Sequence, residues 1–482
     1  MYFKFTFCPI ILLLWASLSF EQNVNVVIHG AASIAEKCDY NQCPWGKAGI
    51  LNLDLRYGAL INAIKAFNPL RIKVGGSLQD NVVYKVGEVS SCPNFMKRED
   101  GLFGFSQGCL SMERWDQLNR FFNHIGVKLT FGLNALFGRN ESQTEKGLWI
   151  GDWQPQNTKD FMQYTISKGY KVDSYEFGNQ LSGSGMGAKV DAKQYGKDVI
   201  VLKNLVKELY AHPETQPKVL GPGGFYEDKW FNTFLEVSGQ GIVDGLTHHI
   251  YNLGPGDDPN MMNKILDPSY LNQVSQTYKG VSDVVNKFRP QLGAWVSESG
   301  GALNGGSKDV SRTFADGFWY LDQMGMASTY DQKVFCRQAL ISGNYGLLNA
   351  TTFVPNPDYY GALLWHRLMG STKKPGVSLI FINLSKDRSL NITLSNAKPG
   401  DAGQPNYEFV GKQNREEYHL RALTGDIKDD IVCLNDVPMV QIDSEDIPAM
   451  DPKLVDASTP ISIAAQSIAY VTIRDFEAPA CD

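Results

Sequence analysis

Short β-rich runs alternate with amphipathic helical patterns along most of this 482-residue chain, and this alternation restricts the fold more than any other feature. A β-rich run at residues 70–77 precedes a helical pattern at 111–126, with Ser111 as the expected N-cap, and a β-rich run at 127–134 follows. About eight such pairs occur, as in a (β/α)8 barrel. We therefore predict an α/β protein in which residues 21–370 form a TIM barrel. A doubly wound open sheet is the alternative.

The pattern changes after about residue 370. The runs at 377–385, 389–396 and 466–476 are short and alternate between apolar and polar residues, with turn residues between them. Helical patterns no longer occur in this part of the sequence. Such alternation is typical of strands with one buried face. We predict that residues 371–482 form an appended, shortened β-sandwich domain.

The first 20 residues have the composition of a secretory signal peptide. Lys4 supplies a positive charge, an apolar run follows, and small residues precede Glu21. The segment is too short and wrongly flanked for a stable membrane span, and a buried N-terminal helix is the alternative. We expect a secreted, extracellular protein, and four glycosylation sequons agree with secretion. They are Asn140, Asn349, Asn383 and Asn391.

Composition argues against several classes of function. The formal net charge is −6 and charged residues make up 20% of the chain, so we expect no basic patch for nucleic acid. After the leader, no segment is apolar enough to cross a membrane, and peripheral association with a membrane stays open. Aromatic residues make up 11% of the chain, which suits a carbohydrate site.

Cysteine usage also fits an oxidising compartment. The chain has eight cysteines, and Cys8 would be removed with the leader. Most of the others should pair, with at least one left free. No Cys-X-X-Cys pair occurs, and neither a metal nor another cofactor is expected. Three pairs lie close enough in sequence to be candidates for bridges: Cys38 with Cys43, Cys92 with Cys109, and Cys433 with Cys481.

Two polar positions end the fourth and seventh strands of the predicted barrel. Glu298 ends a buried run and is followed by glycines, whereas Asn179 and Gln180 end an earlier run. Catalytic residues of TIM barrels lie at these strand ends. A retaining glycosidase needs a nucleophilic carboxylate and a proton-donating carboxyl group about 5–5.5 Å apart. Glu298 fits the nucleophile, Gln180 stands at the proton-donor position, and Asn179 would bind the sugar hydroxyl beside the reacting carbon. An ordinary polar turn at Asn179 and Gln180 is the poorer alternative.

The sequence resembles the plant heparanase-like proteins, within the heparanase and β-glucuronidase glycoside hydrolases. The matching stretches cover nearly the whole mature chain in order, and together they are highly specific. They include "CDYNQCPWGKAGILNLDL", "GGSLQDNVVYKVG", "YEFGNQLSGSGMGA", "THHIYNLGPGDDP", "SESGGALNGG" and "VFCRQALISGNYGLLN".

This resemblance implies a barrel with a β-sandwich, a retaining mechanism and a carbohydrate substrate that contains glucuronic acid. It implies that Glu298 is the nucleophile and that position 180 is the acid/base. It also implies that Tyr251, Gly305 and Tyr345 line the sugar pocket. The implied location is the plant cell wall, with the lysosome or vacuole as the alternative.

The chain departs from the family pattern in three ways. The family motif Gly-Asn-Glu reads Gly-Asn-Gln here, with Gln180 in third place. An acidic residue that contacts sugar in relatives is replaced by Ala31. A cysteine-bearing sandwich strand that usually follows the helix ending in "WHRLMG" is missing, through natural shortening or a faulty gene model. Cys433 would then replace that cysteine as the partner of Cys481.

An amide at position 180 limits the expected chemistry. It cannot release a proton, and loss of a general acid typically costs about 10²–10⁴-fold in rate. We therefore expect a weakened hydrolase that prefers good leaving groups. An inactive protein that binds acidic glycans is the alternative, and a structural wall protein is a third class. With no carboxyl group at position 180, Glu298 is also expected to titrate as a single group.

Overall fold

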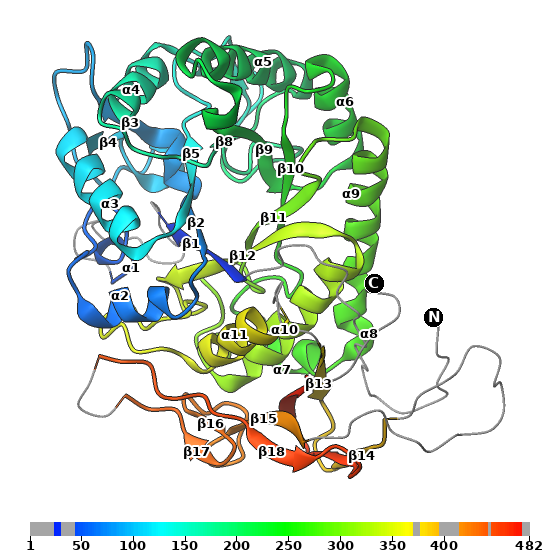
Figure 1. The fold of residues 1–482 in the computed structure, drawn as a ribbon. Helices are drawn as coiled ribbons and strands as arrows, with labels where there is room; N and C mark the ends of the chain where they lie inside the picture. The colour runs from blue at the N-terminus through cyan, green and yellow to red at the C-terminus, as the bar shows by residue number, and fades with distance from the viewer. Residues whose placement is uncertain (1–23, 30–43, 370–375, 395–413, 442–444, 475–482) are drawn as a thin grey trace.

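Eight parallel strands form a closed barrel in the computed structural model, which describes residues 24–29, 44–369, 376–394, 414–441 and 445–474. The first strand pairs with both the second and the last, so the open-sheet alternative is excluded (Figure 1). The predicted TIM barrel is confirmed. In chain order its strands are β1 (Val24–His29), β2 (Arg71–Gly75), β5 (Lys128–Leu133), β8 (Ser174–Phe177), β9 (Lys218–Phe225), β10 (Gly245–Ile250), β11 (Ala294–Ser299) and β12 (Gln332–Ile341).

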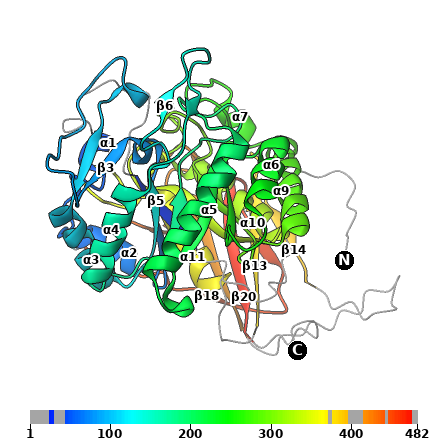
Figure 2. The ribbon, with the colours of Figure 1, turned by 90° about the horizontal axis from the view of Figure 1, so that it is seen from above.

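Helices surround the barrel, and local sequence explains where several of them begin and end (Figure 2). Ser111 Oγ accepts a hydrogen bond from Arg114 N and caps α3, as predicted, and α3 ends at the left-handed Gly126. Asp191 caps α5 in the same way. The helices are α1 (Pro44–Lys47), α2 (Gly58–Lys65), α3 (Met112–Ile125), α4 (Gln156–Ser167), α5 (Ala192–Leu209), α6 (Asp228–Ser238), α7 (Met261–Ile265), α8 (Pro268–Leu271), α9 (Ser275–Phe288), α10 (Phe314–Thr329) and α11 (Pro357–Leu368).

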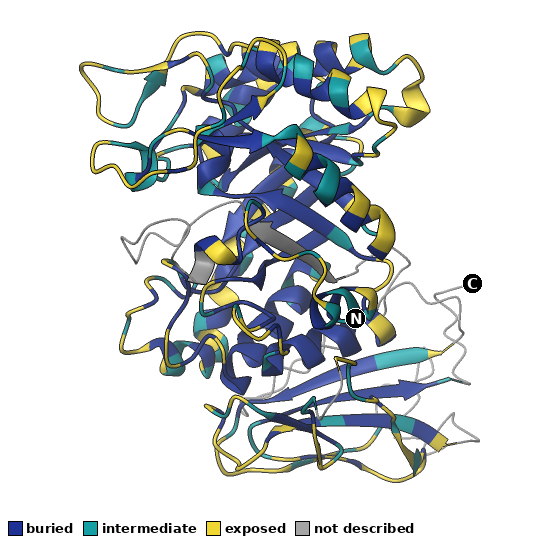
Figure 3. Ribbon diagram, turned by 90° about the vertical axis from the view of Figure 1, so that its left-hand side faces the viewer, coloured by how far each residue is buried: buried dark blue, intermediate teal, exposed yellow. Residues whose placement is uncertain are grey.

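The central barrel strands are buried on both faces. Every residue of β8, β10 and β11 is buried, because side chains alternate between the barrel interior and the helical layer (Figure 3). Polar side chains on these strands are therefore held among packed neighbours. The packed strand therefore holds a functional side chain at its end in a fixed position.

The C-terminal part is a β-sandwich, as predicted. A sheet in the order β13-β20-β15-β16-β17, with β18 also paired to β15, packs on the two-stranded sheet β14–β19. Apolar residues such as Phe381, Ile463 and Val471 fill the space between the two sheets. The strands are β13 (Val377–Asn383), β14 (Leu390–Ile392), β15 (Asn414–Ala422), β16 (Val432–Leu434), β17 (Val437–Pro438), β18 (Lys453–Asp456), β19 (Ile461–Ile463) and β20 (Ser467–Ile473).

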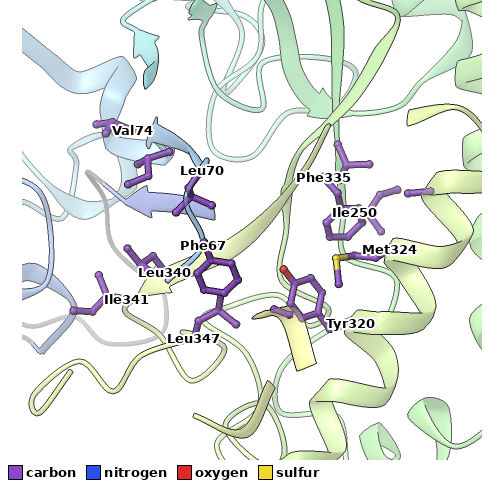
Figure 4. Close-up of a cluster of buried hydrophobic side chains, with 14 of the residues drawn as sticks. Phe67, Leu70, Val74, Ile250, Tyr320, Met324, Phe335, Leu340, Ile341 and Leu347 are labelled. Carbon is purple, nitrogen blue, oxygen red and sulfur yellow. The ribbon is translucent and has the colours of Figure 1, made fainter. Parts of the chain in front are cut away.

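Helices α10 and α11 lie between the barrel and the sandwich (Figure 1). Figure 4 shows Tyr320 and Met324 of α10 beside Ile250 of the barrel. On the other side, the Tyr470 hydroxyl of β20 donates to Gly361 O of α11 at 2.9 Å. This two-sided burial explains why α11 is buried along nearly its whole length.

Smaller elements follow the carboxyl ends of two barrel strands. Two short sheets, β3 (Val82–Lys85) with β4 (Gly108–Ser111) and β6 (Asn140–Glu141) with β7 (Trp149–Ile150), follow barrel strands two and three. In the described ranges no helix is both long and apolar enough to cross a membrane. The expected signal peptide lies outside these ranges.

Candidate active site

His249 of β10 brings the two predicted catalytic positions together. Gln180, which follows the fourth barrel strand, places Nε2 3.0 Å from His249 Nδ1. Glu298, in the seventh strand, places Oε1 3.8 Å from the same nitrogen. Gln180 and Glu298 are therefore at most about 7 Å apart, a range that includes the about 5–5.5 Å separation of retaining glycosidases. Both residues are buried.

The turn that carries Gln180 has an unusual backbone. Gln180 has a φ of 55° and Gly178 a φ of 74°, so both lie in the left-handed region. A non-glycine residue there costs of order 1–3 kcal/mol. Hydrogen bonds hold it in place, because Gln180 N donates to Gly223 O at 2.7 Å and Met186 N donates to Gln180 O at 3.1 Å. These bonds fix the backbone of Gln180, and the contact with His249 holds its side-chain amide in position.

Asn179 presents an unpaired amide at the same turn. Its backbone N–H donates to Asp80 Oδ2 at 2.7 Å, and Asp80 Oδ1 accepts a second bond from Ala135 N at 2.8 Å. Burial raises the pKa of Asp80 to about 7. Within the described part of the chain, both amide atoms of the Asn179 side chain are buried and have no hydrogen-bond partner. An unsatisfied buried amide is costly, so this group is available for a bound ligand.

Lys73 places a positive charge beneath the candidate nucleophile. Its Nζ lies 2.5 Å from Glu176 Oε2 and 3.9 Å from Glu298 Oε2. Burial acts to lower the pKa of Lys73, but Glu176 and Glu298 outweigh it and the pKa is raised. The Lys73 ammonium thus supplies the positive charge between the Glu176 and Glu298 carboxylates. Nowhere among the described residues do three or more His, Cys, Asp or Glu side chains cluster as metal ligands would.

The ionisation of Glu298 depends on three neighbours. Burial raises its pKa, whereas Lys73 and a hydrogen bond from Tyr251 lower it, and Glu176 raises it further. A second carboxylate therefore acts on Glu298 even though position 180 is an amide. Glu176 lies on the barrel interior through its pairing with Lys73. The titration of Glu298 as a single group stays a prediction.

The residues predicted to line the sugar pocket surround the glycine turn after Glu298. Tyr251 Oη donates to Glu298 Oε1 at 2.7 Å. Gly300 is closely packed, since a Cβ there would lie 2.9 Å from Tyr251 Cε1 and 3.1 Å from Tyr345 Cδ1. Gly305 O accepts a bond from Asn344 N at 2.6 Å, which ties its loop to the segment that carries Tyr345. The structure thus brings Tyr251 and Tyr345 to Glu298 and links Gly305 to them through the backbone.

The sequence did not single out Lys73 or Asp80, and only one of the two adjacent histidines of β10 faces the site. His248 faces outward, where Nε2 lies 2.9 Å from Gln332 Oε1 and the ring packs on Tyr278 of α9. Neighbouring strand residues point to opposite faces, so only one of the pair can face the barrel interior. A charged residue inside a strand, as in "RIKVGG", was the available signal for Lys73.

The four sequons differ in exposure. Asn140, Asn349 and Asn391 are exposed. Asn383 is 1% exposed, and its Nδ2 donates to Arg388 O and Ala464 O at 2.8 Å each. Glycosylation would need this nitrogen at the surface. The structure therefore argues against Asn383 as an acceptor, and glycosylation at the four sequons stays a prediction.

Of the predicted disulfides, one is confirmed and one is contradicted. Cys92 and Cys109 form the predicted disulfide, with Cα atoms 5.0 Å apart. Cys433 is a buried free thiol, which contradicts its predicted pairing with Cys481. Ala31, Cys481, Cys38 and Cys43 lie outside the described residues.

A closed barrel with a buried carboxylate on its seventh strand and a polar group after its fourth has the arrangement of a glycoside hydrolase of the TIM-barrel type. Comparison of sequences specifies the class further. Residues 33–325 match the model described as glycosyl hydrolase family 79, N-terminal domain, and the chain belongs to this family.

Named relatives agree with this assignment. The chain is 47% identical to heparanase-like protein 2 of Arabidopsis thaliana, over 92% of this chain and 90% of that protein. It is 35% identical to baicalin-beta-D-glucuronidase of Scutellaria baicalensis, over 90% of this chain and 86% of that protein. The resemblance to plant heparanase-like proteins is thereby confirmed.

Solved structures agree on the fold. A 4-O-alpha-L-rhamnosyl-beta-D-glucuronidase from Fusarium oxysporum 12S aligns with a TM-score of 0.63 and 14% identity, covering 94% of this chain and 97% of that one. A GH51 arabinofuranosidase from Xanthomonas axonopodis pv. citri aligns with a TM-score of 0.60 and 14% identity, covering 86% and 89%. At such identities the likeness concerns the fold alone.

Proposed function

We propose that this chain is a retaining β-glucuronidase-type glycosidase that acts on glucuronides or on glycans containing glucuronic acid. In this proposal Glu298 is the nucleophile and Gln180 occupies the proton-donor position. The observation that carries the proposal is the approach of both side chains to His249 Nδ1, at 3.0 Å and 3.8 Å. The sugar specificity rests on family membership and on the glucuronidase among the relatives.

The first chemical step follows from the charges around Glu298. Its carboxylate attacks the anomeric carbon and forms a glycosyl-enzyme. Lys73 and Tyr251 favour the ionised form needed for attack. The unpaired amide of Asn179 is suited to the sugar hydroxyl next to the reacting carbon, a contact that strengthens in the transition state. Gln180 donates no proton, so the leaving group must depart as an anion, and activity is weakened.

An aryl β-glucuronide assay tests this function. We expect slow phenolate release by the purified protein and none above background in Glu298→Gln. Glu236→Gln is the matched control, because it makes the same chemical change in an exposed pair with Lys287 on the helical layer. Equal phenolate release by wild type and Glu298→Gln, with both folded, would contradict the assignment.

A second candidate is an inactive protein that binds acidic glycans, and the amide at position 180 favours it. It predicts glycan binding by calorimetry, with no turnover in wild type or in Gln180→Glu. Turnover by the wild type excludes it, whereas turnover in Gln180→Glu alone would show that the amide is what inactivates the site.

We also propose that the chain is secreted, to the cell wall or to a vacuole. The leader-like residues 1–20 and the exposed sequons at Asn140, Asn349 and Asn391 support this. Expression in plant cells should give a mature N-terminus near residue 21 and a mass that falls on enzymatic deglycosylation. An intact N-terminus without glycans would contradict it.

A further inference from the structure

We propose that this site transfers its sugar from donors with good leaving groups to acceptors that attack as anions, in preference to water. The donors would be phenolic glycosides or glycosyl esters, and the acceptors carboxylates or thiolates. This inference rests on the proposed function, since it requires the glycosyl-enzyme at Glu298. It concerns which molecule resolves that intermediate.

The two steps need no proton at position 180. In the first step a Glu298 oxygen bonds to the anomeric carbon while the bond to the leaving oxygen breaks, and the electron pair departs on a phenolate or carboxylate. In the second step a lone pair of the acceptor anion bonds to the same carbon. The bond to Glu298 then breaks and its carboxylate is restored. Water in the second step would have to lose a proton, and the Gln180 amide cannot accept one. Both ring nitrogens of His249 are already engaged, since Nδ1 lies 3.0 Å from Gln180 Nε2 and Nε2 lies 3.5 Å from Lys73 Nζ.

Glu176 does not offer a replacement base. Its side chain is fully buried and lies 2.5 Å from the Lys73 ammonium. The backbone also encloses it, because a Cβ on Gly223 would lie 2.9 Å from the Glu176 carboxyl carbon. A carboxylate in this position stabilises Lys73, and taking a proton from water would break that ion pair.

The charge balance of the intermediate favours an incoming anion. Lys73 and Glu176 carry opposite charges, and Glu298 becomes neutral when it is esterified. A glutamate at position 180 would be ionised after donating its proton and would repel an anion. Gln180 is neutral, and its amide, held 3.0 Å from His249 Nδ1, is a hydrogen-bonding group. Gln180 therefore removes from the surroundings of the intermediate the one negative charge that a glutamate would place there.

Product analysis with simple anions tests the inference. The donor is 4-nitrophenyl β-D-glucuronide, and azide or formate is added at constant ionic strength against chloride, with methanol as a neutral acceptor. We expect azide and formate to speed phenolate release about tenfold or more in the wild type, because they need no base. Mass spectrometry should find the β-glucuronosyl azide. Methanol should have no effect, because its attack also requires a base.

Two variants separate the possible results. In Gln180→Glu we expect hydrolysis to rise by about 10²–10⁴-fold and the azide effect to fall below about twofold. In Gln180→Ala the azide effect should persist, because it needs only the absence of a carboxylate. The inference would be overturned if the wild type formed free glucuronic acid at a rate that neither azide nor formate changes. In that case the glycosidase function would still stand. If the wild type and Gln180→Glu both released phenolate no faster than Glu298→Gln does, the proposed glycosidase function itself would be overturned.

Discussion

The hydroxyl of Tyr251, just after the sixth barrel strand, donates a 2.7 Å hydrogen bond to Oε1 of Glu298 on the seventh strand. This bond favours the ionised carboxylate and lowers the pKa of Glu298 against the effect of burial. Hydrogen bonds to charged groups contribute about 1.5–3 kcal/mol. The contact therefore matters for whether Glu298 can attack at mildly acidic pH.

Tyr251→Phe should shift the acidic limb of the activity profile. Loss of the bond raises the pKa of Glu298, so the activity that depends on its ionised form is lost at a higher pH than in wild type. We expect the whole acidic limb to move to higher pH. The measurement is kcat/KM against pH on an aryl glucuronide. Tyr345→Phe is the control, because the Tyr345 hydroxyl accepts from Gln338 Nε2 and is not bonded to Glu298. An unchanged acidic limb in Tyr251→Phe would refute this role.

Lys73→Met should damage both activity and stability. In the wild type the Lys73 ammonium lies 2.5 Å from the Glu176 carboxylate and 3.9 Å from that of Glu298. The variant leaves both carboxylates buried without this cation. Breaking a buried ion pair costs about 3–5 kcal/mol. We expect that loss in urea unfolding, together with a higher pKa for Glu298 and lower activity near neutral pH.

The double variant Lys73→Met/Glu176→Gln provides the check. It removes the stranded charge, so it should recover most of the stability lost in Lys73→Met. If the losses of Lys73→Met and Glu176→Gln simply add, the two side chains do not interact as described.

The sequence predicted the barrel and both strand-end positions because their signals are local. Apolar runs followed by glycine mark β8 and β11, and counting strands gives Gln180 and Glu298 their places. The partners of these residues depend on contacts across the barrel. Lys73 meets Glu176 from a strand about one hundred residues away in sequence, a distance over which local patterns carry no information.

Two further features of the structure depend on neighbours that are distant in sequence. His248 and His249 are adjacent in sequence, and which one faces the site depends on the pleat of β10 within the closed barrel. Asn383 belongs to a valid sequon, but carbonyls of Arg388 and Ala464 occupy its amide in the folded sandwich. Both outcomes require the three-dimensional neighbours.

The buried Asn383 leads to a prediction about glycosylation. Peptide mapping of secreted protein should find glycans on Asn140, Asn349 or Asn391 and none on Asn383. Asn383→Ala should lower the free energy of unfolding by about 1–3 kcal/mol, because it leaves buried carbonyls unpaired. Asn391→Ala is the matched control on an exposed position of the neighbouring strand β14 and should change stability by less than about 0.5 kcal/mol. A glycan on Asn383 would mean that the sandwich packs differently at this strand.

Asp322 of α10 should make stability fall as pH rises. Burial raises its pKa from 3.8 to about 7. The folded chain therefore keeps a proton that the unfolded chain releases between about pH 4 and pH 7, and stability from this group is lost across that window. Asp322→Asn removes the loss. We expect it to be nearly neutral at pH 4 and stabilising by on the order of 4 kcal/mol at pH 8. Urea unfolding at both pH values measures the difference, with Asp309→Asn as an exposed control. An effect of the same size at pH 4 and pH 8 would show that Asp322 carries the same charge in the folded and unfolded chains.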